Sequence, residues 1–407
     1  MNAAYETVET VARTSYGRLV AYLASRSGDV AGAEDALSEA LYKALIHWPS
    51  QGIPTRPEAW LLQTARNHAM DEARKRKVRQ EAMPALWQAA QEAQTAMEQD
   101  LFPDDRLKLL FVCAHPAIDP AVRTPLLLQT VLGFDAARIA SAFLVAPAAM
   151  GQRLVRAKTK IREAGIAFAA PEPDELPARL EAVLEAIYAV YGQGWEDIAD
   201  TASADTREQG FTDEAFWLAR LLVQLLPDEP EAQGLLALLL YCESRRAARR
   251  SPSGDFVPLS RQDSALWSRP KIEEAERLLA QASSHRKLGR FQLEAAIQSA
   301  HTLRGLTGKT NWAAVAALYE GLVQIAPTLG GFVGQAAAVA EWRGPEAGLA
   351  LLHDLAPGAV KSYQPFWAVK AHLLRLLNRT DEANHAFDLA IGLTEDSAVR
   401  QYLLAQR

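Results

Sequence analysis

Hydrophobic residues recur every three or four positions along most of this 407-residue chain. The clearest stretches are AEDALSEALYKAL at 33–45 and PEAWLLQTARNHAMDEARKR at 57–76, and the same period continues through most segments after residue 177. This spacing gathers apolar side chains on one face of an α-helix. Strands alternate apolar and polar residues instead, and such runs are scarce here. The pattern therefore predicts an all-α protein.

Clusters of proline, glycine and acidic residues divide the helical stretches. They predict a loop at 48–57, a linker rich in Gln, Ala and acids at 81–105, a domain boundary at 169–177 and a long break at 244–263. A chain of this length is expected to form two or three domains. The predicted domains are 1–80, 106–168 and 175–407, with 81–105 as the linker.

The helix predicted to begin at Pro57 carries a first candidate binding site. Proline favours the first turn of a helix, and a basic tail ends this one. Asn67, Asp71 and Arg74 follow one another at i, i+4 and i+7, so they share a polar face. The spacing of Trp60 with Leu61 and Ala65 favours a core position for Trp60 over a platform for stacking bases. The basic tail has an alternative interpretation to a binding site, namely a solvated helix end that complements the helix dipole.

A second candidate site lies at 119–163. A short helix is predicted to begin with Asp135 as its N-cap, a tight turn follows at 144–147, and a longer basic helix starts at Ala148. This spacing is typical of a helix-turn-helix, whose second helix enters the major groove. That helix offers side chains that read base edges or hold phosphates, namely Gln152, Arg153, Arg156, Lys158 and Lys160. An ordinary corner of a helical bundle is the alternative.

The charge distribution supports both sites. The net charge is −6, but residues 1–169 sum to +2 and the remainder to −8. Bases concentrate at 66–79, with six bases and two acids, and at 153–162, with five bases and no acid. Short basic clusters of this kind are typical of surfaces that bind polyanions such as nucleic acids.

Several classes of protein find no support in the sequence. The eight histidines lack the spacing of metal ligands, G-x-S-x-G is absent, and GLTGKT at 305–310 lacks the first glycine of a phosphate-binding loop. Cys113 and Cys242 show no disulfide pattern. No secretory leader and no uncharged apolar run of about 18 residues is present. We therefore expect a non-enzymatic cytoplasmic protein without metal, cofactor or membrane span.

Taken together, the two candidate sites resemble one family. AEDALSEALYKAL, RPEAWLLQTARNHAMDEARKRKVR, a linker and the helix-turn-helix at 135–162 resemble, in this order, regions 2 and 4 of bacterial sigma-70 factors of the extracytoplasmic-function group. The later stretches RQDSALWSRPKIEEAERLL, FQLEAAIQSAHTLRG and TNWAAVAALYEGLVQIAPT resemble the subgroup with a C-terminal tetratricopeptide-like domain. The resemblance covers nearly the whole chain.

The resemblance implies two partners for region 2. Its first motif would grip the β′ coiled coil of core RNA polymerase through Asp35, Glu39 and Lys43, with Ser38 standing where glutamine is commoner. The following helix would bind the non-template −10 strand, with Asn67 and Asp71 at the base-reading positions. Phosphate contacts would come from Arg74, Lys75, Arg76 and Lys77. Opening a duplex requires both a pocket for an unstacked base and positive charge along the displaced strand.

Region 4 would read the −35 element and meet the β flap of the polymerase. Gly151 stands where related factors often have a large polar residue, and Arg138 stands where glutamate is usual. The departure at Gly151 leaves Gln152, Val155 and Arg156 as the candidate residues that read the −35 element. The complete set of predicted −35 contacts is Gln152, Arg153, Val155, Arg156, Lys158 and Lys160.

The segment from 175 onward predicts stacked helix pairs. Ala383 and Phe387 form the A-x3-F arrangement of a tetratricopeptide unit after a tight turn at Asn378, and 291–327 has nearly the expected repeat length. Five or more such pairs would build a short solenoid with a concave face. The extension would serve either as a built-in regulator that docks its acidic surface on the DNA-binding faces or as a platform for a protein partner.

Three functions are compatible with these features: a sigma factor, a helix-turn-helix regulator with a helical-repeat sensor that acts without core polymerase, and a tetratricopeptide scaffold. The module at 34–79 distinguishes the sigma factor from the regulator, because a simple regulator needs neither a helix that binds polymerase nor a helix that melts the DNA strands. The sequence favours the sigma factor.

Overall fold

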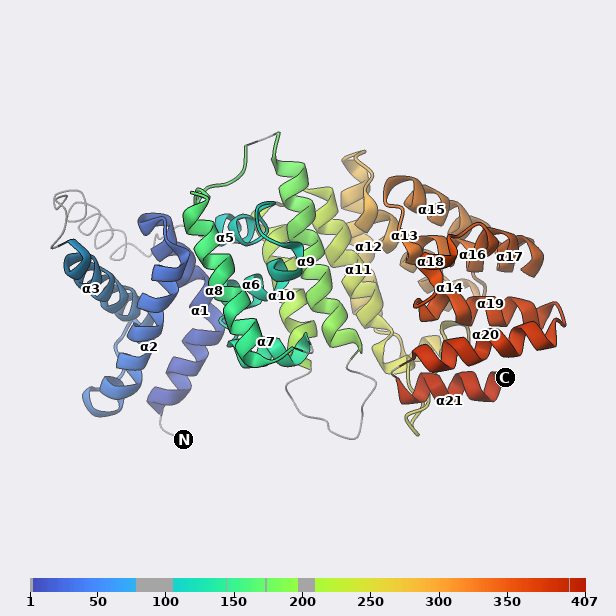
Figure 1. Cartoon of the computed structure of the whole chain (residues 1–407), viewed down its shortest axis with the longest axis horizontal. Helices are drawn as coiled ribbons and strands as arrows, with labels where there is room; N and C mark the ends of the chain where they lie inside the picture. Colours follow the sequence, from blue (N-terminus) through green and yellow to red (C-terminus); the bar gives the residue numbers. More distant parts are fainter. Residues whose placement is uncertain (1–2, 78–104, 144, 173, 197–208, 395) are drawn as a thin grey trace. The chain divides into compact units, whose positions relative to one another are not determined.

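The computed structural model of the chain describes residues 3–77, 105–143, 145–172, 174–196, 209–394 and 396–407 (Figure 1). In these ranges every regular element is a helix, and one isolated β-bridge joins Arg250 to Phe256. The prediction of an all-α protein is confirmed. The chain divides into two compact units, Met1–Val190 and Tyr191–Arg407.

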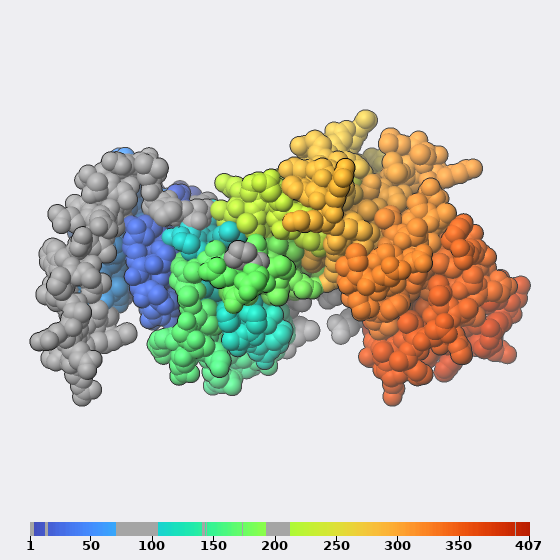
Figure 2. All heavy atoms as spheres, turned by 90° about the horizontal axis from the view of Figure 1, so that it is seen from above, coloured from blue at the N-terminus to red at the C-terminus, as the bar shows by residue number. Residues whose placement is uncertain are grey.

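The first unit contains helices from both candidate sites. They are α1 (Ala3–Ser27), α2 (Val30–Gln51), α3 (Pro57–Lys77), α5 (Arg106–Cys113), α6 (Pro120–Leu132), α7 (Ala136–Ala142), α8 (Pro147–Glu163) and most of α9 (Leu176–Glu196). In the space-filling view, the green and cyan atoms of α5–α8 adjoin the blue N-terminal helices directly (Figure 2). The predicted linker 81–105 lies outside the described residues except for Asp105.

Local sequence explains how α2 and α3 begin. Asp29 caps α2 by accepting a hydrogen bond from the Gly32 backbone N–H at 3.1 Å, and α3 begins at Pro57 as predicted. The predicted loop at 48–57 is too long, because α2 continues through Pro49 to Gln51. The buried Trp48 ring packs edge-to-face on Trp60 of α3, and this contact holds the last turn of α2 in place despite the missing proline N–H.

The short helix and the basic helix predicted for 135–163 are also present. Asp135 accepts a hydrogen bond from the Arg138 backbone N–H at 2.8 Å and so caps α7, as expected. The basic helix α8 begins at Pro147, one residue before the predicted start. Its buried stripe of Met150, Leu154, Ala157 and Ile161 recurs at helical spacing. Leu144, in the predicted turn, lies outside the described residues.

The boundary of the first unit differs from the predicted start of the extension at 175. Arg179, near the beginning of α9, is buried and donates a hydrogen bond to the Phe111 carbonyl oxygen at 2.9 Å. This long-range bond satisfies a carbonyl near the end of α5. The compact unit therefore includes most of α9 and ends at Val190.

The second unit is a succession of helices. It contains α10 (Gln209–Leu225), α11 (Pro230–Ser244), α12 (Arg269–Ser284), α13 (Arg290–Thr302), α14 (Arg304–Thr307), α15 (Trp312–Ile325), α16 (Leu329–Arg343), α17 (Pro345–His353), α18 (Pro357–Val360), α19 (Gln364–Leu376), α20 (Thr380–Leu393) and α21 (Ser397–Gln406). The predicted break at 244–263 is confirmed and carries the short 3-10 turns η2 (Arg246–Ala248) and η3 (Leu259–Arg261); η4 (Ser264–Leu266) follows.

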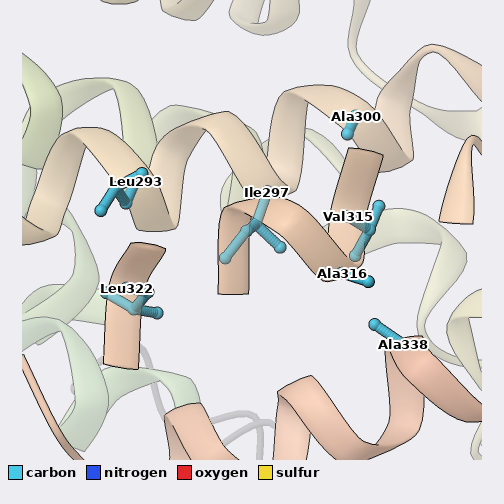
Figure 3. Packing of buried hydrophobic residues seen from close by; sticks show 7 residues of the cluster. All are labelled: Leu293, Ile297, Ala300, Val315, Ala316, Leu322 and Ala338. Atoms are coloured by element: carbon cyan, nitrogen blue, oxygen red, sulfur yellow. The ribbon is translucent and has the colours of Figure 1, made fainter. Parts of the chain in front are cut away.

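Apolar clusters join successive helices of this unit. Figure 3 shows one in which Leu293 and Ile297 of α13 lie with Val315 of α15 and Ala338 of α16. Farther along, Ala383 and Phe387 are buried between α19 and α20, and Asn378 adopts a left-handed conformation (φ 58°) in the tight turn before α20. The predicted hairpin at this place is confirmed.

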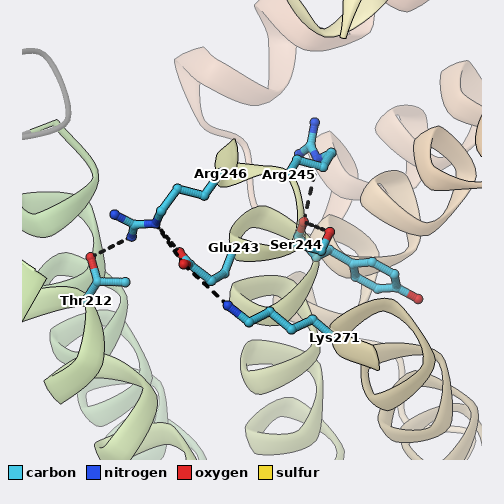
Figure 4. Close-up of polar contacts among 7 residues, drawn as sticks. Thr212, Glu243, Ser244, Arg245, Arg246 and Lys271 are labelled. Atoms are coloured by element: carbon cyan, nitrogen blue, oxygen red, sulfur yellow. Dashed lines mark hydrogen bonds and ion pairs between the residues drawn. The ribbon is translucent and has the colours of Figure 1, made fainter. Parts of the chain in front are cut away.

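Polar contacts fix the turn that follows α11. Arg246 donates to the Glu243 carboxylate at 2.7 Å and to the Thr212 hydroxyl at 3.0 Å, and Lys271 lies 3.4 Å from the same carboxylate (Figure 4). The buried Arg245 reaches Gln298 of α13. These bonds connect α10, α11, α12 and α13, so Arg245 and Arg246 have a structural role.

Candidate nucleic-acid interface

The predicted polymerase-binding residues lie on one side of α2. Asp35 is exposed, while Glu39 and Lys43 are partly exposed and form an ion pair of 3.6 Å one turn apart. An exposed pair of this kind contributes less than about 1 kcal/mol to stability. These side chains are therefore available for a partner.

The same side of α2 also presents large apolar side chains that the sequence analysis did not single out. Tyr42 is 60% exposed and Ile46 is 51% exposed, with Leu45 beside them at 36%. Spacing places Asp35, Tyr42 and Ile46 on one face, opposite the buried Ala36, Ala40 and Ala44. A helical-wheel plot of 33–48 would have revealed them, because they fall outside the apolar stripe that packs inward. Adjacent exposed apolar side chains are typical of protein interfaces.

The predicted −10 residues all belong to α3. Asn67 is exposed, and its side-chain oxygen accepts a hydrogen bond from Gln63 at 3.0 Å. Asp71 and the four bases Arg74, Lys75, Arg76 and Lys77 belong to the helical backbone, but their side chains lie outside the described part of the chain. Trp60 is partly buried, and its ring packs edge-to-face on the buried Trp48 ring.

The outer face of α8 carries five of the six predicted −35 residues. Gln152, Arg153, Val155, Arg156 and Lys160 are all exposed, and Val155 is 63% exposed. Gly151 lies on the same helix, and the nearest atom that a Cβ there would meet is the Ala136 Cβ at 4.0 Å. The surface near the start of α8 is consequently open. Such a face suits entry into a major groove.

Two cationic side chains of this module are engaged within the protein. The Arg138 guanidinium stacks over the Phe134 ring with 3.5 Å to its centroid. Lys158, the sixth predicted −35 residue, points away from the outer face, and its ammonium lies 2.6 Å from the Glu34 carboxylate of α2. The structure thus separates Lys158 from the other predicted readers.

Glu34 occupies an unusual electrostatic environment for a carboxylate. Burial raises the pKa of the Glu34 carboxyl above its usual range, and the Lys158 ammonium offsets part of that shift. Burial therefore has a larger effect on this pKa than the neighbouring ammonium. A buried pair of this type is costly to break, because removal of one partner leaves an uncompensated buried charge.

Metal sites and membrane spans find no support in the described part of the chain. Within the described ranges, no three His, Cys, Asp or Glu side chains come together as metal ligands. Among the described helices, none is long and apolar enough to cross a membrane.

Comparisons with known proteins agree with the geometry of the first three helices. Residues 12–79 match the sigma-70 region 2 family, and residues 179–283 match a family of unknown function, DUF6596. An uncharacterized protein of Rhizobium meliloti (strain 1021) is 38% identical over 382 residues, which cover 92% of this chain and 89% of that protein. No solved structure matches. The chain belongs to one family with the Rhizobium meliloti protein, and it carries a sigma-70 region 2 domain near its N-terminus.

Proposed function

We propose that the chain directs promoter-specific transcription initiation. In this proposal α2 binds the β′ coiled coil of core RNA polymerase, α3 captures the −10 strand and α8 reads the −35 element in the major groove. The region 2 match at 12–79 carries the proposal, because it covers the helices that hold the predicted polymerase and −10 residues. The exposed outer face of α8 supports the assignment of region 4.

The charged and polar side chains of α8 suit the proposed role of this helix in reading the −35 element. Arg153, Arg156 and Lys160 project from the same exposed side of α8 as Gln152. Arginine and lysine can hold phosphates while glutamine reads the edge of an adenine. Val155 would contact a thymine methyl group from the edge of that face. Without a large polar side chain at 151, we expect the −35 preference to depend on Gln152, Val155 and Arg156.

We further propose that the chain is a cytoplasmic member of the extracytoplasmic-function group, with region 4 meeting the β flap. The succession of helix pairs in the second unit, with the buried Ala383 and Phe387, supports a tetratricopeptide-like extension. This extension would regulate the DNA-binding unit or recruit a protein partner. A truncation that tests the choice should end after Val190, because α9 contributes to the first unit.

Association with core polymerase tests the proposal. Labelled full-length chain titrated with core polymerase should form a saturable complex, and the complex should retain promoter DNA that neither component retains alone. A helix-turn-helix regulator would bind its DNA equally well without core polymerase. That result, or the absence of any complex with core, would overturn the proposal.

A further inference from the structure

Two arginines come together where α1 packs on α3. Arg26 lies in the last turn of α1, and its guanidinium stacks over the ring of the buried Tyr22, with 3.7 Å to the ring centroid. Arg66 of α3 lies near the same tyrosine. Burial lowers the pKa of the Arg66 guanidinium, Tyr22 raises it, and the positive charge of Arg26 lowers it. The packing of the two helices therefore holds two like charges close together.

Neither arginine is neutralised by a described carboxylate. Among the described side chains, Arg26 donates a hydrogen bond only to the Ser25 hydroxyl, at 3.5 Å, and Arg66 has no hydrogen-bond or ion-pair partner. The Nη1 atom of Arg66 is also buried. A guanidinium is matched by the paired oxygens of a carboxylate or a phosphate. Because unmatched charges of this kind are costly to hold together, they indicate a binding site for an anion.

An anion can reach both side chains from solvent. Arg26 is exposed and Arg66 is only partly buried. The stacking of Arg26 on Tyr22 occupies one face of the planar guanidinium and leaves the N–H donors at its edge available. Tyr22 thus holds Arg26 in a fixed orientation without consuming its hydrogen bonds.

The two arginines also lie beside the proposed −10 surface. Arg66 directly precedes the exposed Asn67, which is proposed to read a base. From Arg66 to Arg74, where the basic tail of α3 begins, is eight residues or about 12 Å of helix. This length is about the rise of three to four stacked nucleotides of one strand. A DNA strand of that length would extend from the arginine pair to the tail.

The direction of α1 determines where Arg26 lies along α3. The Ser15 hydroxyl of α1 donates to the Glu58 carboxylate in the first turn of α3 at 3.2 Å. Tyr22 and Arg66 meet seven and eight residues farther on, so the two helices run in the same direction. Arg26 is one turn after Tyr22 and therefore lies on the side of Arg66 that leads toward the basic tail.

We propose that Arg26 and Arg66 form a phosphate-binding site for single-stranded DNA, which holds the backbone of the −10 strand beside its base-reading residue. The inference rests on the proposed function, which assigns α3 to that strand. It adds a residue of α1 to a surface that helical spacing had confined to α3. A backbone contact of this kind fixes the position of the strand and carries no sequence preference of its own.

The salt dependence of DNA binding tests the site in the full chain. The probe is a fluorescein-labelled oligodeoxythymidine strand, and its binding is followed by anisotropy over a series of NaCl concentrations. Each phosphate contact of a single strand contributes about 0.7 to the slope of log Kobs against log salt. The double variant Arg26→Gln/Arg66→Gln should therefore lose about 0.7 of that slope and bind about fivefold more weakly at about 0.1 M salt. The loss should be the same for a strand of mixed sequence.

Matched variants separate a phosphate contact from a structural role. Arg26→Lys/Arg66→Lys keeps both charges and should keep the wild-type slope. Arg261→Gln, at an exposed position of the second unit, should change neither slope nor affinity. Circular dichroism and cooperative unfolding check each fold. If Arg66→Gln does not fold, the exposed Arg26→Gln decides alone, and its slope should lie below that of the wild type.

Two results would overturn the site: a wild-type chain that does not bind the strand, or glutamine variants whose slope equals that of the wild type. These readings use the free chain without polymerase. A chain that shows the predicted slopes but binds no core polymerase therefore retains the phosphate site and loses the proposed function.

Discussion

Gly17 of α1 lies against Val131 of α6, where a Cβ at position 17 would stand 2.3 Å from the Val131 carbonyl oxygen. Gly17→Ala therefore forces the two helices apart. Overpacking of this kind costs about 1–3 kcal/mol, which exceeds the roughly 0.5–1 kcal/mol that alanine gains over glycine inside a helix. We expect the free energy of unfolding of the first unit to fall by about 1–2 kcal/mol, measured by urea denaturation.

Gly151→Ala provides the control for this prediction. Its new Cβ would meet only the Ala136 Cβ at 4.0 Å, an ordinary contact, so helix propensity should decide and stability should rise slightly. Equal effects of the two substitutions would show that the packing of α1 on α6 is looser than the structure indicates.

The exposed apolar side chains of α2 predict a loss of binding without a loss of stability. Tyr42→Ala and Ile46→Ala should each change the free energy of unfolding by less than about 0.5 kcal/mol, because both side chains are at least half exposed. Each should weaken binding to core polymerase by about 1–2 kcal/mol, which is roughly a 5- to 30-fold rise in Kd. Leu404→Ala, an equally exposed position in the second unit, is the control in the same titration. Unchanged affinity in both α2 variants would remove this face from the polymerase interface.

His301 makes the second unit sensitive to acid. Burial, together with the nearby Arg245 and Arg304 guanidinium groups, lowers the pKa of His301 to about 4. Because the folded protein then binds fewer protons than the unfolded chain, stability is fully present above about pH 6.5 and is lost as the pH falls toward 4. The loss from this residue should reach up to about 3 kcal/mol.

Denaturation of the chain at pH 7.5, 5.5 and 4.5 measures this effect. His301→Gln should flatten the acid dependence of the unfolding of the second unit. His353→Gln, at an exposed position, should leave that dependence as in the wild type. An identical acid slope in all three proteins would contradict a neutral buried imidazole at 301.

The Glu231 carboxylate joins α11 to the start of α13. It accepts backbone N–H bonds from Phe291 at 2.9 Å and Gln292 at 3.1 Å, and so caps the helix from a different element. Glu231→Ala leaves these donors unsatisfied and should cost about 2 kcal/mol in the second unit. Glu273→Ala removes an exposed ion pair with Arg269 and should cost less than about 0.5 kcal/mol by the same assay. A similar loss in both variants would argue against the cap.

Local features were predictable from the sequence because their causes are local. The Asp135 cap, the start of α3 at Pro57 and the turn at Asn378 depend on a few neighbouring residues. The predicted extent of the loop, 48–57, was wrong because the contact between Trp48 and Trp60 overrides the helix-breaking tendency of Pro49. Tertiary packing of this kind cannot be read from propensities.

The candidate site was predictable only in part. Helical spacing placed Gln152, Val155 and Arg156 on one open face. It could not show that Lys158 turns toward Glu34, because that contact depends on how two modules separated by a linker pack together. The apolar side chains Tyr42 and Ile46 were missed because an apolar residue in a helix is normally assigned to the core.

Transcription in vitro from a randomised promoter library tests the central claim most directly. Purified chain, core polymerase and nucleotides are combined, and the transcript starts are sequenced against a reaction with core alone. We predict starts downstream of enriched −35 and −10 elements that depend on the chain, with altered −35 preference when Gln152 or Arg156 is replaced by alanine. Starts no different from those of core polymerase alone would contradict the assignment of this chain as a promoter-specificity factor.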